Sequence, residues 1–136
     1  MASLLKVDAL TGVTTAGSIS VTGEGNSTTT NLQQGLAKVW VSMTGAGTAS
    51  VTQSFNNSSI TDNGTGDYTL ANTNAFNYAD YATGCGSQWR RSLYTVAQTT
   101  STINFYTTQP DASETSLSDS GSTGFSVTFT GFGDLA

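Results

Sequence analysis

The stretch Ser58–Leu70, SSITDNGTGDYTL, decides the fold class of this chain. Two segments with strand-forming side chains flank a turn that contains Asn63-Gly64 and, shortly after it, Gly66-Asp67. Asn-Gly is a strong short-range signal for a β-hairpin, because both residues adopt positive φ at little cost. Beyond the turn, Tyr68 and Leu70 follow the two-residue spacing of a strand. The stretch therefore predicts an antiparallel β-hairpin.

The composition of the whole chain agrees with a β protein. At 136 residues it has the length of one domain. Charged residues make up only 10% of it, well below the roughly 25% of ordinary soluble domains. Ser, Thr, Asn and 15 Gly suit strands and tight turns, whereas no long segment shows the apolar repeat of an amphipathic helix. Six Phe, five Tyr and two Trp are more aromatic residues than a disordered chain of low hydrophobicity carries.

Charge and reactive residues exclude several classes of function. The formal net charge is −5, and the only basic residues are Lys6, Lys38, Arg90 and Arg91, so we expect no nucleic-acid partner. No apolar run has the length of a membrane span, and the first ten residues lack the apolar region of a secretory signal. A single Cys85 precludes an internal disulfide, and without any His it lacks the usual partner of a catalytic thiol.

Residues 1–35 differ from the remainder of the chain. They contain no aromatic residue, their apolar residues are thinly spread, and Gly23–Asn31 is polar and of low complexity. Such a segment buries too little apolar surface to fold alone. It can lie along its own globular part or pack against other subunits, and we favour the second arrangement. We therefore expect an extended N-terminal arm, residues 1–35, for attachment or oligomerisation, followed by one domain, residues 36–136.

From residue 36 onward, strand patterns recur at short intervals. In the first of them Val39, Val41 and Met43 share one face and Trp40 takes the other. We predict about seven or eight strands in an all-β, antiparallel β-sandwich with jelly-roll-like or immunoglobulin-like connections. Besides the hairpin, the expected strands lie at Leu36–Met43, Thr48–Phe55, Ala75–Thr83, Gln88–Ala97, Ser101–Thr107 and Gly124–Gly131.

Two segments also resemble a known family. GLAKVWVSM at Gly35–Met43 and SFNNSSITDNGTGDYT at Ser54–Thr69, with NYADY at Asn77–Tyr81, are similar to a module of tail-fibre-like virion proteins from environmental tailed bacteriophages. The opening LKVDALTGVTTAGSISVTGEG, Leu5–Gly25, resembles the attachment segments that precede such modules. The resemblance implies a position on the virion surface, a homotrimer, and contacts of residues 1–35 with other virion proteins. Fibres are usually longer than this chain, so a capsid decoration protein, of the cement or head-fibre kind, remains an alternative.

Aromatic residues are the best candidates for binding. Aromatic and Arg side chains are enriched where proteins meet partners, and sugar rings pack flat against aromatic faces. The alternative is that these aromatic residues belong to the core, as alternate residues of a strand often do. For the adjacent arginines we consider an ion pair with Asp80 at a subunit contact. The candidate residues for a host surface or a subunit contact are Tyr78, Tyr81, Trp89, Arg90, Arg91 and Tyr94.

We expect neither catalysis nor a cofactor nor a metal. Most of the carboxylates stand in predicted turns, where Asp caps its own backbone. The sequence DNGTGD, Asp62–Asp67, lacks the alternating acids and the distant Glu of a helix-loop calcium site. Together with the resemblance to tail-fibre-like modules, this implies a non-enzymatic structural protein of a phage particle, a short fibre or fibre tip that aids attachment to the host, with a host-surface glycan as a candidate partner. A free carbohydrate-binding module is the alternative from another class.

Overall fold

The computed structural model describes residues 4–12, 19–22, 29–87, 92–109, 117–119 and 126–135. The chain divides into two compact units, Met1–Leu36 and Ala37–Ala136. In the first unit, β1 (Ser20–Thr22) pairs with β2 (Thr29–Asn31) in an antiparallel ribbon. The short helix α1 (Leu32–Gly35) follows, and its first amide donates to the Ile19 carbonyl oxygen at 2.8 Å.

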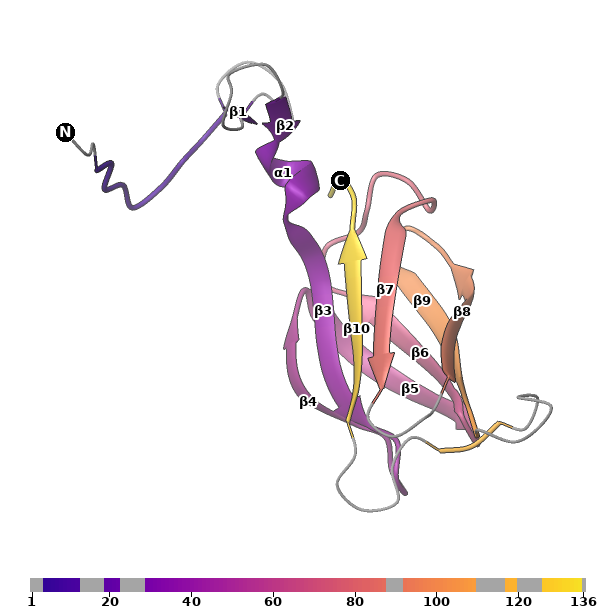
Figure 1. Cartoon of the computed structure of the whole chain (residues 1–136). Coiled ribbons are helices and arrows are strands. Elements are labelled where there is room, and N and C mark those ends of the chain that lie inside the picture. Colours follow the sequence, from indigo (N-terminus) through magenta and orange to yellow (C-terminus); the bar gives the residue numbers. More distant parts are fainter. Residues whose placement is uncertain are drawn as a thin grey trace. The chain divides into compact units, whose positions relative to one another are not determined.

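The second unit contains two four-stranded antiparallel sheets among its described residues (Figure 1). The first sheet has the order β4-β3-β10-β7, so that the first and last strands of the unit pair at its centre. The second sheet has the order β5-β6-β9-β8. The bounds are β3 Ala37–Thr44, β4 Ser50–Phe55, β5 Asn57–Gly64, β6 Asp67–Asn72, β7 Ala82–Ser87, β8 Ser92–Gln98, β9 Thr102–Thr108 and β10 Val127–Phe132.

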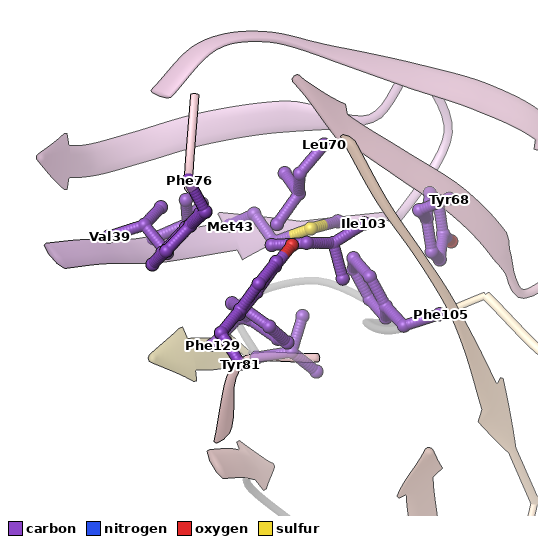
Figure 2. Close-up of a cluster of buried hydrophobic side chains, with 11 residues drawn as sticks. Val39, Met43, Tyr68, Leu70, Phe76, Tyr81, Ile103, Phe105 and Phe129 are labelled. Atoms are coloured by element: carbon purple, nitrogen blue, oxygen red, sulfur yellow. The ribbon is translucent and has the colours of Figure 1, made fainter. Parts of the chain in front are cut away.

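The two sheets enclose one hydrophobic core, which confirms the predicted antiparallel sandwich. Alternate residues of the central strands point inward because successive side chains of a strand face opposite sides of its sheet. Figure 2 shows their side chains meeting between the sheets. All of them are at most 7% exposed: Val39, Val41 and Met43 of β3, Tyr68 and Leu70 of β6, Ile103 and Phe105 of β9, Val127 and Phe129 of β10, with Phe76 and Tyr81.

A single residue carries the chain from one sheet to the other. β4 ends at Phe55 and β5 begins at Asn57, and between them Asn56 has a φ of 57°. Asn tolerates this left-handed conformation better than most residues. Its side chain donates to the Asn74 carbonyl oxygen at 3.1 Å and accepts the Asn74 amide proton at 2.7 Å, while its carbonyl accepts from Thr73. Asn56 therefore joins the sheet corner to the loop that follows β6.

At the far end of β6, the β5–β6 turn is tied to the segment 117–119. Gly66 has a φ of 68°, and an added Cβ would lie 2.6 Å from the Ser118 amide and the Thr107 carbonyl oxygen. The Gly66 amide donates to an Asp119 carboxylate oxygen at 2.9 Å, and the Ser118 amide donates to Thr107 at 3.0 Å. The Tyr68 hydroxyl lies 3.2 Å from the same Asp119 oxygen. These contacts close that end of the sandwich.

Several local expectations need correction. The hairpin exists, but its turn falls at Thr65-Gly66 and Asn63 stays within β5, because the Gly66 turn is the one that packs on Ser118. The expected strand at 75–83 is instead a loop in which Phe76 makes an isolated bridge to Leu135, and β7 begins only at Ala82. There the ring of Phe76 stacks on Tyr81 at 3.8 Å, so core packing shaped this segment rather than strand pairing.

Candidate functional site

The strongest candidate site lies on the outer surface of the sheet β5-β6-β9-β8. Ile103 and Phe105 point into the core, so their neighbours Asn104 and Tyr106 point outward. The register then places Asp67 of β6 beside Tyr106 and Tyr94 of β8 on its other side. We call this surface the tyrosine face and define it by six residues, Asn63, Asp67, Thr69, Tyr94, Asn104 and Tyr106.

One half of the tyrosine face is a network of amide and carboxylate groups. The Asn104 side-chain amide donates to Asp67 Oδ1 at 2.7 Å, to the Tyr68 carbonyl oxygen at 3.1 Å and to Thr69 Oγ1 at 3.2 Å. The Asn63 side-chain amide donates to the same Asp67 oxygen at 3.1 Å and to Thr69 Oγ1 at 2.8 Å. The Asp67 carboxylate is therefore held in place by two amides from two different strands.

The other half is a pair of tyrosine rings. Tyr94 and Tyr106 lie edge to face, with their ring centroids 5.7 Å apart and their planes at 72°. This arrangement is the favourable one for the ring quadrupoles, and it restrains both side chains. Tyr94 is 44% exposed and Tyr106 is half-buried, so both rings reach solvent. The face thus combines a restrained aromatic surface with oriented polar groups.

The opposite sheet carries a second exposed surface of a different character. Trp40 of β3 lies opposite Phe55 of the edge strand β4. On its other side Trp40 lies opposite Thr130 of β10, and Phe132 stands two residues after Thr130 in the same strand. These three large side chains are 38–51% exposed, although most of their neighbours on the outer surface are Ser, Thr and Gln. We call Trp40, Phe55 and Phe132 the tryptophan face. Aromatic clusters of this kind are enriched at protein–protein contacts.

The structure describes three of the six residues that the sequence predicted as a binding site, and it places them in different surroundings. Tyr94 lies on the tyrosine face, whereas Tyr78 is 75% exposed in the loop between β6 and β7. Tyr81 is only 7% exposed and belongs to the core, stacked on Phe76, so its ring is not offered to a partner. Trp89, Arg90 and Arg91 lie outside the described residues, and so the suggested pairing of an arginine with Asp80 stays a prediction.

Burial changes the acidity of two groups near the core. It raises the pKa of the Tyr81 hydroxyl to about 12, an effect that the nearby Asn72 side chain partly offsets. Burial also raises the pKa of the Cys85 thiol on β7, with a smaller opposing contribution from the Thr95 side chain. A raised pKa disfavours the reactive thiolate, which argues against a nucleophilic role for Cys85.

Sequence reasoning missed Tyr106, Asn104 and Asp67 as site residues. The signal was available for two of them, because the two-residue spacing of Ile103 and Phe105 puts Asn104 and Tyr106 together on the opposite face of the strand. Asp67 was interpreted only as a turn residue. Its approach to Asn104 depends on the pairing of β6 with β9, which are separated by the whole of β7 and β8 in the sequence. Such non-local pairing does not appear in the local pattern.

Within the described residues, no group of three or more His, Cys, Asp and Glu side chains is placed to hold a metal ion. No helix within the described ranges is long and apolar enough to cross a membrane. Comparisons with protein-family models, curated protein sequences and solved structures find no match to this chain.

Proposed function

We propose that this chain is a non-enzymatic structural protein on the surface of a tailed-bacteriophage virion, a homotrimeric short fibre or fibre tip that aids host attachment. One observation carries the proposal: a first unit with exposed apolar side chains precedes a sandwich that buries its own core and presents aromatic side chains on both outer faces. The resemblance of Gly35–Met43 and Ser54–Thr69 to tail-fibre-like modules supplies the virion context.

The first unit supports an attachment role. Leu4 and Leu5 are 79% and 80% exposed, and Leu10 is 60% exposed. Leaving such side chains in water forgoes about 1.5–3 kcal/mol each relative to full burial. A surface on another virion protein would recover this free energy, and so we assign residues 1–35 to docking on the particle.

The tryptophan face supports self-association. Three large aromatic side chains on one sheet surface, with Phe55 on an edge strand, provide the apolar centre that subunit interfaces use. We assign Trp40 and Phe55 to the contact between subunits of the trimer. The tyrosine faces of the three subunits then remain available, and three weak sites acting together give stronger attachment than one.

The decisive experiment locates the protein on the particle. Purified virions from a phage that encodes this chain would be probed with gold-labelled antibody and imaged by cryo-electron microscopy. We expect label and density at the tail, and a trimer when the recombinant chain is measured by light scattering. Absence of the protein from purified particles would overturn the proposal.

The same experiment separates a second candidate, a capsid decoration protein. The exposed leucines of the first unit favour it equally well, because a decoration protein clamps the shell through an extended segment. It would need no receptor site. Density on the capsid instead of the tail would select this function.

A third candidate, a free carbohydrate-binding module, is favoured by the tyrosine face alone. Such a module would be monomeric, absent from virions and active in glycan binding as an isolated protein. A monomer mass in light scattering, together with absence of the protein from a blot of purified virions, would select this function.

A further inference from the structure

The hydrogen-bonding balance of the tyrosine face is uneven. The side-chain amides of Asn63 and Asn104 already donate to Asp67 and Thr69. Within the described residues, no donor is directed at Asn63 Oδ1, Asn104 Oδ1 or Asp67 Oδ2. Side-chain donors are therefore used inside the network, while three acceptor oxygens are left for a ligand. A complementary ligand must bring several hydrogen-bond donors.

The tyrosine rings add a second requirement. Tyr106 stands next to Asp67 in the register, and Tyr94 stands next to Tyr106, so the ring pair continues the row that the carboxylate begins. Because the rings are restrained edge to face, little side-chain entropy is lost when a flat apolar surface packs on them. The ligand should thus have an apolar face beside a rim of donors.

We propose that the tyrosine face binds a neutral glycan, with a pyranose ring packed on Tyr94 or Tyr106 and hydroxyls of this and neighbouring sugar units donating to Asp67 and the two Asn oxygens. A pyranose has an apolar C–H face and a rim of adjacent hydroxyls, which matches both requirements. Hydrogen bonds to the Asp67 carboxylate are charge-assisted and are the stronger ones. Glycans bearing carboxylates or sulfates would be repelled by Asp67 and by the net charge of −5.

This inference builds on the proposed role in host attachment and names its ligand class. A cationic ligand is the competing outcome, since ammonium groups also seek a carboxylate beside aromatic rings. A quaternary ammonium such as choline has no N–H donor, so it would contact Asp67 and the rings and leave the Asn oxygens unpaired, which is why we favour the glycan. Salt separates the two, because binding of a neutral sugar changes little between 50 and 500 mM NaCl whereas binding of an ammonium weakens.

The test uses the full chain in affinity gels containing dextran, mannan, galactan or laminarin, followed by calorimetry with oligosaccharides of the retarding polymer. We expect retardation by at least one polymer and about a tenfold loss of affinity in Tyr106→Ala and in Tyr94→Ala. The matched control is Tyr78→Ala, which removes an exposed tyrosine from the loop after β6 and should bind like the wild type. Tyr94→Phe and Tyr106→Phe keep the aromatic ring and should retain most of the binding. Circular dichroism checks that each Ala variant is still folded.

Three results would overturn the inference. The first is that none of the four polymers binds. The second is an equal loss of affinity in Tyr78→Ala. The third is that choline binds in calorimetry in a salt-dependent manner while no polymer binds. The position of the protein on virions does not depend on any of these results. Virion location without glycan binding therefore refutes the inference alone, whereas glycan binding without virion location refutes the proposed function alone.

Discussion

The two units of this chain differ in what their apolar side chains meet. In the sandwich, Phe105 and Leu70 are almost completely buried between two sheets. In the first unit, the leucines of the described segment 4–12 are 60–80% exposed, and every residue of β1 is exposed as well. Both units contain strands, so strand formation alone does not decide stability. The sandwich supplies its own apolar partners, whereas the leucines of the described segment 4–12 stay exposed.

Removing an apolar side chain from each unit in turn tests this difference in burial directly. Phe105→Ala should lower the free energy of unfolding by about 3–5 kcal/mol, because it leaves a cavity in a packed core. Leu5→Ala, the matched truncation in the first unit, should change it by less than about 0.5 kcal/mol. Urea unfolding at fixed protein concentration, followed by Trp fluorescence, measures both. Similar losses in the two variants would remove the distinction.

A second prediction concerns how the sandwich closes one of its ends. Gly66→Ala should cost about 3 kcal/mol or more, because a positive φ is combined with a Cβ placed 2.6 Å from backbone atoms of Ser118 and Thr107. Gly47→Ala is the control, since Gly47 has a φ of 71° and an added Cβ meets nothing within 4 Å. It should show only the strain of about 1–2 kcal/mol. Equal losses would mean that the contact with segment 117–119 contributes nothing.

The sheet corner offers a smaller effect. Asn56→Ala should lower the unfolding free energy by about 2 kcal/mol, because it loses the hydrogen bonds to Asn74 and strains a residue with a φ of 57°. Asn56→Gly relieves the strain and should cost only about 1 kcal/mol. Chemical denaturation of the two variants side by side checks the order. If Asn56→Gly lowered the unfolding free energy more than Asn56→Ala, the positive φ of residue 56 would not be the source of the lost stability.

Alkaline pH should test the core through Tyr81. The folded state raises the pKa of this hydroxyl to about 12 from its usual value near 10, so folding favours the protonated form. Its contribution is complete below pH 10 and is lost as the pH rises toward 12. Tyr81→Phe removes the titrating group and should flatten that part of the stability profile. Parallel profiles for wild type and variant across this window would contradict the burial of Tyr81.

The smallest expected change in stability comes from the largest deletion. Removing residues 1–36 should leave the melting temperature of the sandwich nearly unchanged, because the core residues all belong to the second unit. Incorporation into virions should be lost at the same time if residues 1–35 dock on the particle. Thermal melts and a blot of purified particles provide the two readings. A strongly destabilised sandwich would show that the first unit is part of its core.

Local patterns predicted well which side chains share a face, and predicted the connections poorly. The alternation grouped Val39, Val41 and Met43 on one face, and the structure buries that face, because each strand needs only its own sequence to alternate. The loop before β7 shows the limit of this reasoning. Tyr78 and Tyr81 stand three residues apart, yet one is 75% exposed and the other is in the core, because Phe76 provides a stacking partner for Tyr81.

The amino-acid order was sufficient for the class of the domain, the presence of its main hairpin and the contrast between residues 1–35 and the rest. These properties depend on side-chain periodicity and composition, which are local. Pairing between distant strands was needed to bring Asp67 to Asn104 and Tyr94 to Tyr106, and to bring Asp119 to the Gly66 turn. The candidate site arises from such contacts because sheet register, and not spacing along the chain, sets which side chains become neighbours.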